Sequence, residues 1–439
     1  MRKINTRDFH LATRSTPREV NRQIVLNLIR EHQPISRADL ARRMDVARGA
    51  LTEIVRELVA AGMVYESGAD RDVRGPGRRG TLLRMQTHGR LALAVDVRPE
   101  RTTVALADFG GAMLAQDVIP TPETPHALID ALVASIATLR PAAAAGYKPG
   151  FGADDMVDEC HGVGLVLPGM VDPRTGRLLY APRLRWRDVE LREPLAARLA
   201  LPVFVESAPI ACGLARLWLF PDETASVRSF AYASISDGVG VGLVTNGEVI
   251  RGESQTAGEF GHISLDVHGP PCVCGKRGCW EAFTNNTATV ERYVDRVMRR
   301  RAGARSAAEN RGRPADDPEA AAADARAFAR PIGIDDVIRR AQRGEEEAIS
   351  AVAETGWYLG QGLVAVVNAF NPGRIYIGGE ITAVWPLLEG PIRQALAEGT
   401  LTDSARLTHV VPDRRPAEYR LLGAVALVTA PTLAAPLVG

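Results

Sequence analysis

The first 85 residues alternate between amphipathic segments and turn residues. Apolar residues recurring at helical spacing predict three helices, over residues 17–32, 36–44 and 48–61. Ser36 is placed to cap the second helix, and Gly62 is placed to end the third. Two short helices joined by the tight turn 45–47 match a helix-turn-helix.

Two short apolar segments, 63–65 and 81–85, follow these helices and read as the strands of a β-wing. Between them lies a loop of glycine and charged residues that includes RGPGRRG at 74–80. The sequence therefore predicts a winged helix-turn-helix over residues 1–86, a DNA-binding domain.

The expected DNA contacts fall in two places. The first turn and a half of the recognition helix presents Arg48, Ala50 and Thr52, which suit base edges and phosphates in the major groove. The alternative is that Arg48 and Thr52 only cap a surface helix. The wing loop presents a second set of contact residues, Arg74, Arg78 and Arg79, which suit a narrow minor groove. The alternative is that this loop is only a flexible linker.

Residues 87–439 alternate between apolar strands and helices, the pattern of an α/β body. Predicted strands cover 91–97, 102–107, 162–167, 203–206, 230–235, 240–244 and 374–377, and predicted helices cover 125–140, 334–342 and 345–370. We expect a loop at 142–158. A compositionally biased insertion at about 303–330 is expected to be partly helical or disordered.

Charge separates the two regions. Residues 1–84 hold 17 Lys and Arg against 10 Asp and Glu, whereas the remaining residues hold 36 against 42. A basic head on an acidic body favours an anionic partner for the head alone, although an ordinary solvated surface has the same pattern. The sequence has no apolar run near the ~20 residues that span a bilayer and no apolar segment of signal-peptide type near Met1, so we expect a cytoplasmic protein without membrane contact.

One segment has the spacing of a metal site. His262 precedes Cys272 by ten residues, and Cys274 and Cys279 follow within eight positions. Three thiolates and one imidazole would complete a closed tetrahedral shell, which predicts one structural zinc ion per chain. The alternatives are three buried free thiols, or His268 in place of His262.

These residues also resemble a known family. Glu259-Phe260-Gly261-His262 followed by Cys-x-Cys-Gly-x-x-Gly-Cys-x-Glu, ending at Glu281, resembles the ROK family (repressors, open reading frames, sugar kinases) in its regulator branch. Further matches are Leu167-Pro168-Gly169-Met170-Val171-Asp172, the stretch from Gly238 to Gly242, Asn371-Pro372-Gly373 and Gly378-Gly379.

The resemblance implies an actin/hexokinase-like (ribonuclease H-like) body of two α/β lobes around a sugar cleft. It implies that Glu259, His262 and Glu281 bind a sugar or sugar-phosphate effector. It also implies a homodimer or homotetramer that binds inverted-repeat operators in double-stranded DNA, most often as a repressor of carbohydrate-related genes.

Two departures from the family's kinases predict that this chain is not an enzyme. The glycine-rich phosphate hairpin is replaced by Asp96-Val97-Arg98-Pro99-Glu100-Arg101, which removes an amide donor and adds charge. The general-base aspartate is replaced by Ala208, which accepts no proton. The alternatives are an ATP-dependent sugar kinase with a fused head, or a scaffold body in which Glu259 or Glu281 only supports the zinc histidine.

Overall fold

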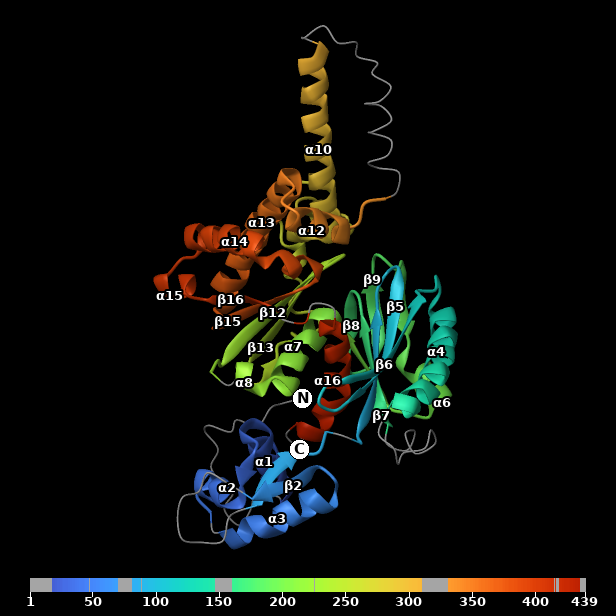
Figure 1. The fold of residues 1–439 in the computed structure, drawn as a ribbon, viewed down its shortest axis with the longest axis vertical. Helices are drawn as coiled ribbons and strands as arrows, with labels where there is room; N and C mark the ends of the chain where they lie inside the picture. The colour runs from blue at the N-terminus through green and yellow to red at the C-terminus, as the bar shows by residue number, and fades with distance from the viewer. Residues whose placement is uncertain are drawn as a thin grey trace. The chain divides into compact units, whose positions relative to one another are not determined.

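The computed structural model describes residues 18–46, 48–69, 81–87, 89–146, 160–224, 226–309, 331–413, 415 and 418–434 (Figure 1). Its contacts divide the chain into two compact units. The first comprises Met1–Phe230, Gly242–Ala257 and Glu418–Gly439, and the second comprises Ala231–Val241 and Gly258–Ala417.

The head of the first unit is a winged helix. It contains α1 (Arg18–His32), α2 (Arg37–Met44), α3 (Arg48–Ala60) and a sheet of β1 (Ile35–Ser36), β3 (Thr81–Met85) and β2 (Val64–Ala69) in that order. The Ser36 side chain accepts a hydrogen bond from the Asp39 amide, and Asp45 takes the left-handed conformation that ends α2. Leu40, Val55 and Leu58 are fully buried between the helices. The predicted helices, cap and wing strands are confirmed.

The body part of the first unit is built on a five-stranded sheet. Its strands are β4 (Leu91–Val97), β5 (Arg101–Asp108), β6 (Met113–Pro120), β7 (Cys160–Leu167) and β11 (Val203–Ser207), in the order β11-β7-β4-β5-β6. β4 pairs antiparallel with β5 and parallel with β7. Every residue of β4 is buried, which explains why all of them except Asp96 are apolar. A small sheet of β8 (Met170–Asp172), β9 (Arg177–Ala181) and β10 (Trp186–Glu190) lies beside it.

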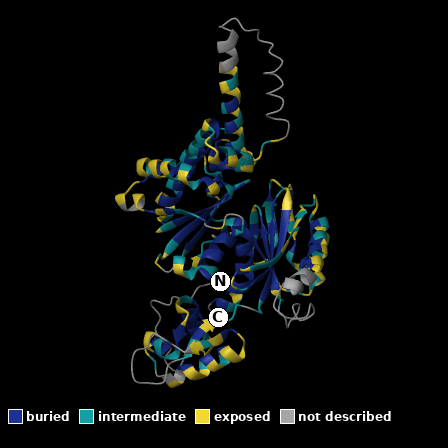
Figure 2. Cartoon of the chain, in the orientation of Figure 1, coloured by how far each residue is buried: buried dark blue, intermediate teal, exposed yellow. Residues whose placement is uncertain are grey.

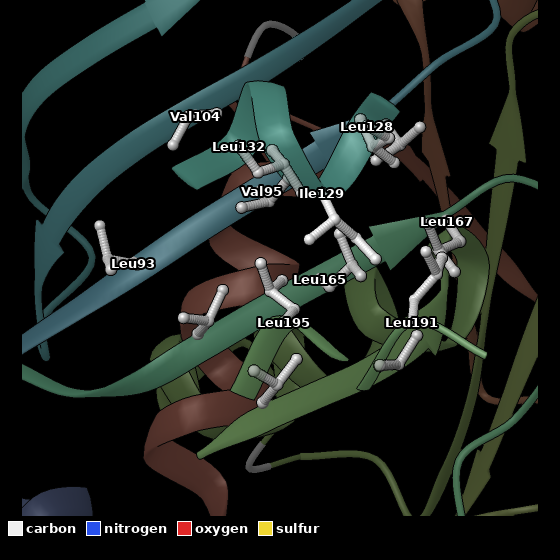
Figure 3. Packing of buried hydrophobic residues seen from close by; sticks show 14 of the residues in the cluster. Leu93, Val95, Val104, Leu128, Ile129, Leu132, Leu165, Leu167, Leu191 and Leu195 are labelled. Atoms are coloured by element: carbon white, nitrogen blue, oxygen red, sulfur yellow. The ribbon is translucent and has the colours of Figure 1, made fainter. Parts of the chain in front are cut away.

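Helices cover both faces of this sheet. On one face, α4 (Pro125–Gly146) and α6 (Arg192–Leu199) bury Leu128, Ile129 and Leu195 against Val95 and Leu165 (Figure 3). On the other face, α16 (Tyr419–Leu433) packs on β4, β7 and α7 (Ala208–Leu219), which is followed by α8 (Pro221–Thr224). The closest approach is between α16 and β7, where any side chain larger than that of Gly164 would collide with a helix carbonyl.

A second five-stranded sheet forms the base of the other lobe. Its strands are β12 (Ser229–Ile235), β13 (Val239–Thr245), β14 (Glu248–Val249), β15 (Arg374–Gly378) and β16 (His409–Pro412), in the order β14-β13-β12-β15-β16. The accompanying helices are α9 (Trp280–Thr284), α10 (Asn286–Glu309), α12 (Ile334–Gln342), α13 (Glu346–Phe370), α14 (Trp385–Gly399) and α15 (Asp403–Arg406), with the 3₁₀ helices η1 (Phe260–His262) and η2 (Glu380–Val384).

Both large sheets have one topology. In each, the first three strands are sequential neighbours and the last two lie beyond the first strand. The central strands of both sheets are largely buried, while exposed residues lie on the surrounding helices and on outer strands such as β6 (Figure 2). This repeated α/β arrangement confirms the expected two-lobed actin/hexokinase-like body behind a winged helix.

Two predictions about irregular segments need correction or stay open. Residues 142–146, predicted as loop, form the last turn of α4, because this alanine run has the highest helix propensity. The rest of the loop, 147–158, lies outside the described residues. Of the insertion at about 303–330, residues 303–309 are the end of α10 and 310–330 lie outside the described residues. Among the helices described, none is long and apolar enough to cross a membrane.

Candidate functional site

The metal-ligand residues predicted from spacing come together in the second unit. The ligand atoms of His262, Cys272, Cys274 and Cys279 all lie within 4.8 Å of one another. The Cys272 Sγ lies 3.7 Å from the His262 Nδ1, and the Cys274 and Cys279 sulfurs lie 3.6 Å apart. His268 is exposed and is not a member of the cluster. Four donors in this arrangement can hold a metal ion.

The chain forms the cluster through a tight loop. The Cys272 amide donates to the Lys276 carbonyl at 2.8 Å, and the Gly275 amide donates back to the Cys272 carbonyl at 2.9 Å. Gly275 has φ +90° and Gly278 has φ +65°, and a Cβ on Gly278 would lie only 1.5 Å from the Asp266 carbonyl oxygen. Glycine is therefore required where the loop turns back on itself.

Burial changes the chemistry of these thiols. It raises the pKa of Cys272 to about 12, so without a neighbouring cation this thiol keeps its proton at neutral pH. A bound cation supplies the charge that makes a thiolate favourable, and proton release accompanies binding. Three thiols and one imidazole are also the donor types that zinc binds in structural sites.

Glu281 lies directly beside the cluster. It is 6% exposed, and its Oε2 accepts the Val239 amide proton at 2.9 Å. Its other oxygen, Oε1, lies 4.0 Å from the Cys272 Sγ. Gly238 permits this contact, since a Cβ there would approach the Glu281 Oε2 to 2.9 Å. The backbone of β13 thus fixes this carboxylate in one orientation.

Glu259 lies on the other side of the histidine. Its Oε2 is 3.9 Å from the His262 Nε2, and its side chain is 43% exposed. Burial raises the pKa of Glu259, with the charge of Glu281 adding to the shift and His262 opposing it. The imidazole therefore faces the thiols through Nδ1 and a partly exposed carboxylate through Nε2. The three predicted ligand-binding residues occupy one continuous group with the metal cluster.

The structure describes only some of the predicted DNA-contact residues. Arg48 and Ala50 lie in the first turn of α3, and Thr52, in the next turn, is exposed. The wing arginines Arg74, Arg78 and Arg79 lie outside the described residues. Their roles remain predictions.

The first hairpin of the body contains a buried charge cluster. Asp96 is 3% exposed, and its Oδ2 lies 2.8 Å from the Arg98 Nε. Its Oδ1 lies 2.5 Å from the Nε of Arg420, which also donates to the Val97 carbonyl at 2.9 Å. The guanidinium of Arg98 lies 5.9 Å from the Tyr419 ring centroid. Two arginines therefore neutralise one carboxylate at the position where family kinases have a glycine-rich hairpin.

The hairpin turn uses its own backbone groups. The Arg98 amide donates to the Arg101 carbonyl at 3.0 Å, and the Thr121 amide donates to the Glu100 carbonyl at 3.2 Å. The Thr121 hydroxyl donates to the Arg98 carbonyl at 2.7 Å. Pro99 has no amide proton. The turn is thus closed by internal hydrogen bonds.

The residues around Ala208 are also enclosed. Glu206 is 1% exposed and forms an ion pair with Arg251 at 2.6 Å, while its Oε1 accepts the Ser207 amide proton at 2.8 Å. Burial raises the pKa of Glu206, although the charge of Arg251 opposes the shift. Ala208 is buried at the start of α7. The nearest carboxylate is therefore engaged with an arginine.

Sequence reasoning missed both arginine partners. Arg420 contacts Asp96 across 324 positions of sequence, and Arg251 contacts Glu206 across 45. Neither arginine stands in a recognisable motif. Only the unusual Arg98 in the hairpin indicated that a charge partner was needed.

Family models match the two regions separately. The ROK family model matches residues 92–430, and the MarR family model matches residues 23–74. The second match falls on the winged helix, and the first covers nearly all of the body.

Similar proteins align over almost the whole chain. The xylose repressor of Bacillus spizizenii is 24% identical, with 88% of this chain and 89% of that protein aligned. The DNA-binding transcriptional dual regulator NagC of Escherichia coli is 27% identical, with 94% and 92% aligned. Both proteins are named as regulators of transcription, and both match the head as well as the body.

Solved structures agree with these relatives. A ROK family transcriptional regulator, homologous to the E. coli MLC protein, has a TM-score of 0.71 at 26% identity, covering 94% of this chain and 96% of that one. A ROK family glucokinase from Streptomyces griseus has a TM-score of 0.60 at 23% identity, covering 77% and 98%, and shares the fold of the body. The chain belongs to the ROK family.

Proposed function

We propose that this chain is a sequence-specific DNA-binding transcription repressor of carbohydrate-related genes, and that its kinase-like body senses a sugar-type ligand. The observation that supports this most directly is a winged helix and a ROK body in one chain, aligned over 88% of its length with a protein named as a repressor. The domain boundary proposed is between residues 86 and 87. As the family resemblance implies, the proposed operator is an inverted repeat bound by a homodimer or homotetramer.

The metal in this proposal is one structural zinc ion per chain. Tetrahedral zinc with Zn–S bonds of ~2.3 Å separates two sulfurs by about 3.8 Å. The 3.6 Å separation of the Cys274 and Cys279 sulfurs is close to this value. Four protein donors leave no open position, so the role of the ion is to hold the loop and not to activate water.

The effector would bind at the group formed by Glu259, His262 and Glu281. A zinc bond to the His262 Nδ1 would fix the imidazole orientation, so that Nε2 stays directed at Glu259. The partly exposed carboxylate of Glu259 is suited to accepting hydrogen bonds from sugar hydroxyls. The same contacts also fit the alternative that the body is only a scaffold, in which Glu259 orients the histidine and binds no sugar. A measurement of sugar binding separates the two.

Helix α7 offers a route from the body to the head. It begins at Ala208, where the family's kinases bind and deprotonate the sugar, and its twelve residues rise about 18 Å. At its other end, Arg30 of α1 donates to the Leu217 and Trp218 carbonyls at 3.3 and 2.9 Å. Any displacement of α7 would therefore move the first helix of the DNA-binding head.

Loss of phosphoryl transfer is part of the proposal. Ala208 has no proton acceptor, and absence of a general base typically lowers a rate by about 10²–10⁴. The hairpin that would hold ATP phosphates is closed on itself, and Arg98 lies against Asp96. The alternative, an active sugar kinase with a fused head, would require both features to rearrange.

Two experiments test the proposal. Fluorescence anisotropy with the gene's own promoter region, over a salt series, should give sequence-specific binding. The variant Arg78→Ala/Arg79→Ala should weaken it several-fold and lower the salt slope, because each phosphate contact releases counterions. An unchanged slope would exclude the wing from DNA contact.

A coupled ADP-release assay over a hexose panel should show no turnover, and robust turnover would establish the kinase alternative.

A further inference from the structure

A pocket lies between the DNA-binding head and the body within the first unit. Its volume is about 230 Å³. The head contributes Arg30 of α1, Gln33 directly after that helix, and Met63 and Met85 at the wing. The connecting segment contributes Gln86, Thr87 and Arg90, and the body contributes Phe109, Gly110, Trp218, Leu219, Pro221, Thr429, Thr432 and Leu433. Any molecule bound here would touch both parts.

The lining combines positive charge with aromatic walls. The guanidinium of Arg30 lies 5.1 Å from the Trp218 ring centroid, and that of Arg90 lies 5.1 Å from the Phe109 ring centroid. Of the described residues that line the pocket, none is Asp or Glu. The pocket is therefore cationic and largely apolar.

The nearby acidic groups do not neutralise both arginines. Glu31 lies 3.4 Å from the Arg30 Nη2. Asp108 accepts the amide protons of Gly110 and Ala112 at 2.9 and 2.8 Å. Arg90 has no ion pair with any described residue, and its buried Nε has no hydrogen-bond partner among them. The indole Nε1 of Trp218 is likewise buried without a partner in the described chain. These donors lack the acceptors that buried polar groups normally have.

We propose that this pocket is a binding site for a small organic anion that has one carboxylate and an aromatic or compact apolar part. The carboxylate would accept hydrogen bonds from Arg90, and the apolar part would lie against Phe109 and Trp218. Charge-assisted hydrogen bonds of this kind are about twice as strong as neutral ones. Burial lowers the pKa of Arg90, and a bound anion would restore the stability of its charged form.

The site would be separate from the effector residues, since Glu259, His262 and Glu281 all belong to the other unit. The expected effect of a bound ligand follows from the helices that line the pocket. A ligand that bridges α1 and α7 would favour one placement of the head on this unit and so alter operator affinity. Only this last step rests on the proposed function.

Isothermal titration calorimetry of the full chain with benzoate tests the site itself. Binding of one benzoate per chain is expected, with benzamide, which lacks the charge, binding much more weakly. Arg90→Gln should weaken benzoate binding by about tenfold or more, because it removes a charged donor. Arg90→Lys should retain most of it. Arg228→Gln, at an exposed arginine of the same unit outside the pocket lining, is the matched control and should bind as the unaltered chain does.

Thermal unfolding without ligand checks that each variant is folded. Equal affinity for benzoate and benzamide, absence of binding to the unaltered chain, or unaltered binding by a folded Arg90→Gln variant would overturn the site. Operator titration with saturating benzoate tests the consequence: a change in affinity of at least threefold is expected, absent in Arg90→Gln. Normal operator binding that benzoate leaves unchanged would overturn the regulatory step and leave the proposed function intact.

Discussion

The buried charge cluster of the first hairpin leads to a quantitative prediction. Asp96 is the shared counter-charge of Arg98 and Arg420, and all three side chains are less than 10% exposed. The substitution Asp96→Asn keeps the volume but removes the carboxylate charge that these two buried arginines share. Removing one partner of a buried pair costs about 3–5 kcal/mol.

A control in the same cluster separates charge from packing. Arg98→Met removes one cation and leaves Asp96 paired with Arg420, so the cluster becomes neutral. Replacing part of a buried ionic cluster by an apolar side chain is often close to neutral. We therefore expect a small change in stability for Arg98→Met and a large loss for Asp96→Asn.

Thermal unfolding followed by circular dichroism measures the difference. With a fall of roughly 2–4 °C per kcal/mol, Asp96→Asn should lower the midpoint by roughly 6–20 °C relative to the unaltered chain. The unfolding midpoint of Arg98→Met should remain close to that of the unaltered chain. If both variants unfold at the same temperature, Asp96 is not the centre of a buried ionic cluster, and the explanation given for the lost phosphate hairpin is wrong.

Three further predictions test other parts of the account. Cys279→Ser should reduce zinc, measured by elemental analysis, from about one ion per chain to substoichiometric content, because zinc prefers thiolate donors; full zinc content would exclude this cysteine as a ligand. Arg30→Met should lower the free energy of unfolding in urea by about 1.5–3 kcal/mol through loss of the carbonyl contacts to Leu217 and Trp218, and no change would exclude that anchor. Ala208→Asp alone should not produce ADP release with hexoses, because the closed hairpin remains; turnover would show that only the base was missing.

Local features of the fold were predictable from sequence. The helices of the head follow from apolar spacing and from Ser36, whose side chain makes the expected cap. The metal cluster was predictable because three of its four donors fall within eight residues, so the local turn alone brings them together. Strand β4 was visible as a short run that is apolar at every position except Asp96.

Features that depend on distant contacts were not predictable. The three-stranded sheet β8–β10 was missed because its strands are short and several of their residues are polar and exposed. Strand β1 has only two residues and exists because β3 pairs with it. The contact of Arg420 with Asp96 depends on the packing of α16 against β4. No single-sequence pattern encodes such pairs.

The central claim is that this chain recognises a DNA sequence through its winged helix. The most direct measurement is fluorescence anisotropy of its own promoter region against a shuffled sequence of equal length at physiological salt. We expect binding to the promoter to be at least about 10³-fold tighter than binding to shuffled DNA, the lower end of the range for specific regulators. Equal affinity for both sequences would contradict it.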